Sequence, residues 1–289
     1  HRSRLPELCD AIARELSKAW NDQFYASTAL AASQVWISFL HQVINEHRDW
    51  HLPDELTGLI DWETSPVPIE DYFRFQPITD KPLLPKEQGR KVKPQAETLL
   101  KLSNVQAERL VVLLGSAGSG KSTCLRYLCN SLSHHALKTI SENPSVRNFE
   151  VPILISLKHF GSVDLFSLIR AHLRARDVSG NHQDIENLLE SGQATFLLDG
   201  FDEVGQEYRR GLVSQIEWLR NLLPNSRIFL TSREQALSLH LAGFKKYRIQ
   251  ELDRASIHPF IECYLGQDYH TFIEVFEDFQ VADLVRTPL

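Results

Sequence analysis

The sequence predicts an α/β fold: a parallel sheet flanked by helices, with a helical region before it and a small helical domain after it. Apolar runs of strand length alternate with segments of helical periodicity between residues 106 and 252. The first run, Leu110–Leu114, leads into a glycine-rich loop and then a helix. Two later apolar runs, at 195–198 and 227–231, are each followed by charged residues. Such alternation is typical of a sheet whose strands run parallel, with helices on both faces.

The bulk composition is that of a soluble globular chain. Its 289 residues, 43% hydrophobic and 24% charged, allow one or two domains with a substantial core. The net charge of −6 and pI near 6.1 argue against a nucleic-acid-binding surface. The longest stretch without formal charge, residues 23–45, is too polar to span a bilayer, so no membrane is expected. Four cysteines without metal-ligand spacing predict reduced thiols in a cytoplasmic protein.

The first 105 residues divide into two regions by composition. Residues 1–62 are predicted to form a helical interaction or adaptor region, because apolar residues recur at steps of three and four from Leu5 and again from Leu30. Residues 63–105 are predicted to be a proline-rich linker that leads into the next domain and packs on it. A short run at 72–75 is a candidate edge strand.

The remaining chain is predicted to hold a nucleotide-binding domain at 106–252 and the start of a helical domain at 253–289. The predicted strands are 110–114, 151–157, 195–198, 227–231 and 246–249. The predicted helices are one that follows the glycine-rich loop, 163–174, 185–189 and 212–223.

The glycine-rich loop is a complete match to the phosphate-binding pattern G-x-x-x-x-G-K-[ST]. Its glycines let successive backbone N–H groups point at phosphate oxygens, and the following helix N-terminus also favours an anion. Lys121 would reach the terminal phosphates, and the Ser122 hydroxyl would bind Mg²⁺. The predicted nucleotide-binding residues are Gly115, Ser116, Ala117, Gly118, Ser119, Gly120, Lys121, Ser122 and Thr123.

An acidic segment follows the third predicted strand. The run TFLLDGFDEV places Asp199 at the carboxyl edge of the sheet, beside the phosphate loop, where it would hold Mg²⁺. Gly200 leaves room there for backbone and metal-bound water. Asp202 and Glu203 follow at the distance needed to polarise a water in line with the terminal phosphate, and the spacing does not choose between them.

The fourth predicted strand ends in the segment RIFLTSRE. It delivers Thr231, Ser232 and Arg233 to the same edge of the sheet. Arg233, a planar and permanently charged donor, is predicted to contact the γ-phosphate as a third catalytic residue; a surface ion pair is the alternative.

Together these residues resemble the NACHT family of STAND-class P-loop NTPases, which includes NOD-like receptors and bacterial antiphage proteins. The discriminating match is DGFDE at 199–203, and the GSAGSGKST and LTSRE segments also fit. The resemblance implies that Pro288, in the C-terminal RTPL, contacts the nucleotide base. It also implies that the family's winged-helix domain would follow Leu289.

The resemblance further implies a signalling switch in innate immunity or antiphage defence. Such a switch is closed with ADP, self-associates with ATP, and resets by slow Mg²⁺-dependent hydrolysis. The alternatives are a work-cycle ATPase of the AAA+ type or nucleic-acid remodeller, and a silent scaffold that binds nucleotide only for structure. ATP or ADP is the expected ligand, although no residue visibly distinguishes adenine from guanine.

Overall fold

A computed structural model describes residues 28–50, 67–68, 78–79, 105, 107–142, 149–176, 194–236 and 241–249. The predicted first helix, the strand at 72–75, the helix at 185–189 and the region 253–289 with Pro288 lie outside these ranges. The helices are α2 (Thr28–His47), α6 (Lys121–Glu142), α7 (Leu165–Arg174) and α9 (Gln206–Leu222). The strands are β1 (Asp49–Trp50), β2 (Val67–Pro68), β3 (Ile78–Thr79), β4 (Leu110–Leu114), β5 (Val151–Ser156), β6 (Ala194–Asp199), β7 (Arg227–Ser232) and β8 (Lys245–Ile249). Three 3₁₀ turns are η2 (Leu157–His159), η3 (Phe201–Glu203) and η4 (Glu234–Ala236).

The main sheet confirms the predicted architecture. Its five parallel strands lie in the order β8-β4-β7-β6-β5, and β3 adds an antiparallel strand beyond β8. β5 therefore lies at an edge, as Pro152 near its start requires. One segment of the proline-rich linker, β3, also joins the sheet, because Ile78 pairs with Ile249 in β8. β1 and β2 form a separate antiparallel pair.

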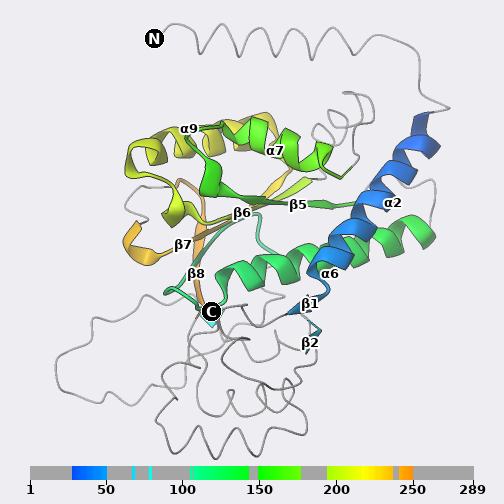
Figure 1. Cartoon of the computed structure of the whole chain (residues 1–289), viewed down its shortest axis with the longest axis horizontal. Helices are drawn as coiled ribbons and strands as arrows, with labels where there is room; N and C mark the ends of the chain where they lie inside the picture. Colours follow the sequence, from blue (N-terminus) through cyan, green and yellow to red (C-terminus); the bar gives the residue numbers. More distant parts are fainter. Residues whose placement is uncertain are drawn as a thin grey trace, which may run out of the picture.

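Helices cover both faces of the sheet (Figure 1). α7 and α9 lie on one face, and α6 lies on the other with α2 across it. The long core face of α6 buries Cys124, Leu125, Leu128 and Cys129. The two thiols are free, and burial raises the pKa of each well above its ordinary value, so both remain protonated.

Helix α2 shares the hydrophobic core of the sheet domain. Trp36, Phe39 and Leu40 are each at most 4% exposed and belong to the same cluster of buried residues as the sheet. A hydrogen bond joins the last residue of α2 to α6: the Asn130 amide donates to the His47 carbonyl at 3.3 Å. The described part of the N-terminal region is therefore packed onto the sheet domain, while its role as an adaptor stays a prediction.

The amino ends of the strands are tied together by ion pairs. The Arg227 guanidinium, at the start of β7, donates to both carboxylate oxygens of Glu150 at 2.9 and 3.0 Å. The Thr195 hydroxyl, on β6 between them, also donates to Glu150. Farther along this edge, Lys245 pairs with Glu108 at 2.5 Å. The first two contacts tie β7 and β6 to the residue before β5, and the third ties β8 to a residue just before β4.

None of the helices in the described ranges has the length and apolar character needed to cross a membrane.

Candidate nucleotide-binding site

Three parallel strands end together at the carboxyl edge of the sheet. Leu114 of β4 is in register with Ser232 of β7, and Leu198 of β6 is in register with Leu230. β7 therefore lies between the phosphate-loop strand and the strand that carries Asp199. The sequence analysis expected Asp199 beside the loop; the structure places it at the same edge, one strand farther away. The intervening strand brings its own side chains into the site.

The phosphate loop follows β4 and opens α6. Gly118 and Gly120 have φ angles of 71° and 85°, in the left-handed region that glycine adopts without strain. A Cβ atom at Gly115 would overlap the hydroxyl oxygen of Ser119. That hydroxyl is buried and lacks a hydrogen-bond partner in the described part of the chain. The glycines thus shape a tight loop around an unsatisfied donor.

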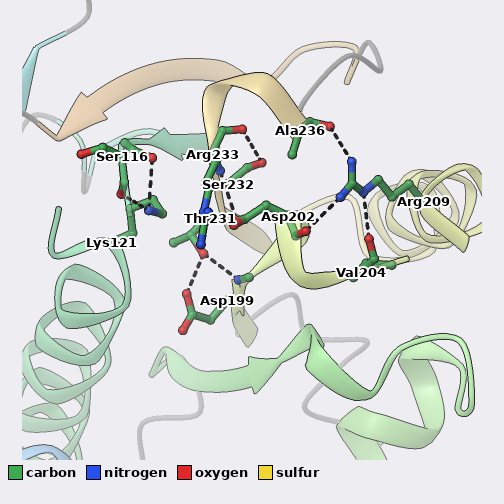
Figure 2. A network of polar contacts seen from close by, with 12 residues as sticks. Ser116, Lys121, Asp199, Asp202, Val204, Arg209, Thr231, Ser232, Arg233 and Ala236 are labelled. Atoms are coloured by element: carbon green, nitrogen blue, oxygen red, sulfur yellow. Dashed lines mark hydrogen bonds and ion pairs between the residues drawn. The ribbon is translucent and has the colours of Figure 1, made fainter. Parts of the chain in front are cut away.

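Lys121 folds back over this loop. Its ammonium donates to the carbonyl oxygens of Ser116 at 2.6 Å and Gly115 at 3.1 Å (Figure 2). Burial lowers the pKa of Lys121, while the neighbouring Asp202 acts in the opposite direction by stabilising the charged form. The charges of Arg233, Asp199 and Glu203 also act on it.

The predicted site residues are therefore brought together around Lys121. Ser122 lies exposed in the first turn of α6, and Thr123 is buried. Pro288 lies outside the described residues, so its contact with a base stays a prediction.

Asp199 is held by a residue of the middle strand. The Thr231 hydroxyl donates to Asp199 Oδ1 at 2.6 Å and accepts from the Gly200 N–H at 2.7 Å. Gly200 has φ 86°, and a Cβ there would lie 3.1 Å from the Glu203 carboxyl carbon. The room beside Gly200, which the sequence predicts to hold metal-bound water, is thus bordered by Glu203.

The two acids after Gly200 have different environments. Asp202 faces Arg233: its Oδ2 lies 2.8 Å from Arg233 Nε, and its Oδ1 accepts from the Arg233 N–H at 3.1 Å. The Asp202 side chain is 11% exposed, whereas that of Arg233 is 57% exposed. Glu203 is exposed at the end of η3. The surface ion pair that the sequence left open for Arg233 is present, with its partner inside the site.

The sequence placed Thr231 at this edge without a role in the network, and it did not point to Arg209. Thr231 had a signal, since its hydroxyl lies on the last residue but one of a buried strand. Arg209 had none: the predicted helix began at 212, whereas α9 begins at Gln206 and brings Arg209 against the acidic loop.

The residues at this edge fit a nucleotide with a divalent cation. The buried Ser119 hydroxyl and the glycine backbone suit an anion that accepts hydrogen bonds. The Asp199 carboxylate and the exposed Ser122 hydroxyl are hard oxygen donors of the kind that Mg²⁺ prefers. Mg²⁺ in phosphate sites commonly takes only one or two protein ligands and keeps the rest of its shell for water and phosphate.

Comparison with known proteins agrees with this geometry. The family model of the NACHT domain matches residues 109–268, more than half of the 289-residue chain, and begins one residue before β4. No curated protein matches the chain. Among solved structures, PCH-2 from C. elegans matches with 17% sequence identity and a TM-score of 0.32, over 56% of this chain. This chain spans 41% of that one. The family match and the phosphate-loop edge identify the chain as a member of the NACHT family, whose domain is a nucleotide-binding P-loop NTPase.

Proposed function

We propose that this NTPase is a STAND-class signalling switch that is closed with ADP and self-associates with ATP. Hydrolysis is slow, depends on Mg²⁺ and resets the switch, and the protein acts in the cytoplasm in innate immunity or antiphage defence. The observation that carries this proposal is the pairing of Arg233 with Asp202 next to Lys121.

Arg233 has the properties of a group that can change partners. Its backbone is anchored by the N–H bond to Asp202, but its side chain is more than half exposed. Because this guanidinium is more than half exposed, solvent screens its pairing with Asp202, and a γ-phosphate beside Lys121 can compete for it. ADP lacks that group. A guanidinium with two alternative acceptors therefore distinguishes ATP from ADP and can bias the arrangement of the loops around it.

The remaining residues divide the other tasks. Lys121 and the loop amides bind the phosphates, and Ser122 and Asp199 hold the metal. When bound, Mg²⁺ neutralises charge on the phosphate oxygens. Glu203 is exposed at the site and is the better candidate to polarise water, because Asp202 also accepts the Arg233 backbone N–H, a bond that does not depend on the guanidinium. Pro288 is proposed to contact the base.

Light scattering tests the switch most directly. Molecular mass is measured for the whole natural protein with its trigger, in Mg²⁺ with ADP or with a non-hydrolysable ATP analogue, for wild type and Arg233→Ala. We expect the mass to rise only with the ATP analogue in the wild type. The Arg233→Ala variant should bind both nucleotides and show no rise.

A steady-state turnover assay, with and without DNA, separates the switch from a work-cycle ATPase. The switch predicts slow turnover that DNA leaves unchanged. Rapid turnover by a monomer, with no nucleotide-dependent change in mass, would contradict the switch and support the motor. Binding with no turnover at all would support the silent scaffold.

A further inference from the structure

Arg209 lies in the first turns of α9, between two loops of the carboxyl edge (Figure 2). Its Nε donates to the Val204 carbonyl at 2.9 Å, and its Nη2 donates to the Asp202 carbonyl at 2.9 Å. Its Nη1 lies 3.4 Å from the Ala236 carbonyl oxygen, on the other loop. One side chain therefore contacts the loop of the acids and the loop of Arg233.

These contacts close a ring through both loops. Arg209 holds the Asp202 carbonyl, and the Asp202 carboxylate holds the Arg233 N–H. The Arg233 carbonyl in turn accepts from the Ala236 N–H at 3.1 Å, and the Ala236 carbonyl returns to Arg209. Each member thus fixes the next. The second loop is also tied to β8, because Arg248 pairs with Glu234.

The ring needs an arginine. A guanidinium presents five N–H donors in a planar fork, so three of them can point at three carbonyls at once. The Arg209 guanidinium also lies 6.0 Å from the centre of the buried Phe201 ring, which restricts its plane. A lysine ammonium is a single point and cannot reach carbonyls on both loops together.

We propose that Arg209 is a positioning residue. It fixes the position of the Asp202 loop relative to the Arg233 loop, so that Arg233 can distinguish a terminal phosphate. This inference rests on the proposed function of Arg233. Among the described residues, the partners of Arg209 are backbone carbonyls and the Phe201 ring, so it acts on Asp202 and Arg233 through the two loops.

The first test measures the two loops without nucleotide. Amide hydrogen exchange at 201–204 and 233–236 is compared for wild type, Arg209→Lys and the matched control Arg210→Lys. Arg210 is the next residue and is exposed. We expect Arg209→Lys to speed exchange in both loops by about tenfold, as the loss of hydrogen bonds from a charged donor predicts, and Arg210→Lys to change neither. Faster exchange in one loop only, or equally across the domain, would overturn the positioning role.

The second test measures nucleotide preference. In Mg²⁺, the ratio of affinities for a non-hydrolysable ATP analogue and ADP should fall about tenfold in Arg209→Lys, with ADP affinity unchanged. In the Arg233→Ala background, Arg209→Lys should not change this affinity ratio further, because Arg209 is proposed to act through Arg233. Independent, additive effects would overturn the inference. If the wild type itself shows no preference, the switch proposal fails, whereas the exchange result still decides whether Arg209 couples the loops.

Arg209→Gln guards against a variant that does not fold. It removes the charge and keeps a side-chain N–H group, and it is judged by the same two measurements. If neither Arg209→Lys nor Arg209→Gln folds, Arg209 is a residue of general stability and the positioning role is wrong.

Discussion

The two edges of the sheet use the same kinds of charged residue in different ways. At the amino edge, Arg227 and Glu150 form a two-oxygen contact at the first residues of the strands, with side chains 21% and 27% exposed. At the carboxyl edge, Arg233 and Asp202 lie on turns beyond the strands, and the Arg233 side chain is 57% exposed.

The difference shows how position decides what an ion pair does. A partly buried pair at the amino ends of the strands, such as Arg227 with Glu150, ties parts of the sheet together. A pair on turns beyond the strands, beside Lys121 and Asp199, lies where a phosphate or a metal can take over one member. The amino edge is therefore expected to carry stability and the carboxyl edge to carry binding and hydrolysis.

The largest expected effect comes from substituting Glu203, the exposed acid at the carboxyl edge. Glu203→Gln removes the carboxylate proposed to polarise water and should lower the turnover rate by at least about 100-fold, with nucleotide affinity unchanged. Steady-state phosphate release and a binding titration measure the two quantities. If Glu203→Gln turns over normally and Asp202→Asn does not, the base is Asp202.

The second effect at the same edge concerns Asp199, the residue proposed to hold Mg²⁺. Asp199→Asn keeps an oxygen that can accept the Thr231 hydroxyl bond but loses the charge that holds Mg²⁺. We expect nucleotide affinity in Mg²⁺ to fall about tenfold, to the value that the wild type shows in EDTA. Calorimetric titration in Mg²⁺ and in EDTA measures this; an Mg²⁺ response equal to that of the wild type would show that Asp199 does not hold the metal.

At the amino edge, a matched substitution should change stability alone. Arg227→Gln leaves Glu150 without its guanidinium and should lower the free energy of unfolding by about 1–3 kcal/mol, because hydrogen bonds to charged groups contribute about that much. Lys138→Gln, in an ion pair whose side chains are 70% and 65% exposed, should change it by less than about 0.5 kcal/mol. Urea unfolding measures both. A loss of nucleotide affinity in Arg227→Gln would contradict the division between the edges.

The attachment of α2 adds a pH dependence that neither edge should share. Burial lowers the pKa of His47 to about 4 and that of His172 to about 3, from the ordinary 6.5. Both histidines are therefore neutral when folded, and protons bind more readily to the unfolded chain. Their stabilising contribution is complete above about pH 6.5 and is lost as the pH falls toward 4 and then 3.

Thermal unfolding between pH 7 and 5 tests this effect. We expect a loss on the order of 4 kcal/mol at pH 5, with a similar share from each histidine, and therefore a loss reduced by about half in His172→Phe. An identical pH profile in His172→Phe and wild type would show that His172 does not titrate in this way. The nucleotide-free chain should show the same profile as the bound one, since His172 lies on α7 against Phe39, away from the loop.

Much of the fold follows from sequence patterns. Leu110–Leu114 is a uniform apolar run and Arg227–Ser232 has an apolar centre, and the ends of both strands were predicted to within a residue because glycine or charge follows each. The helix start at Gln206 was missed by six residues, since the polar first turns of α9 carry no apolar periodicity. The true start brings Arg209 to the site.

The candidate site was predictable wherever a motif fixes local geometry. The loop around Lys121 needs only consecutive residues, so its pattern suffices. Strand order is not local: nothing in the sequence places β7 between β4 and β6, so the bond from Thr231 to Asp199 could not be foreseen. The choice between Asp202 and Glu203 likewise needed the position of Arg233.

Binding of nucleotide at the carboxyl edge should depend on Lys121, and a thermal-shift measurement tests this dependence. With ATP and Mg²⁺ at about 100 times the dissociation constant, linkage adds about 2.7 kcal/mol to the wild type. At about 2–4 °C per kcal/mol, the melting temperature should rise by several degrees. Lys121→Ala should fold with a similar nucleotide-free melting temperature and show no rise, because the ammonium that would meet the phosphates is gone. An equal rise in Lys121→Ala would contradict the account and place the nucleotide elsewhere.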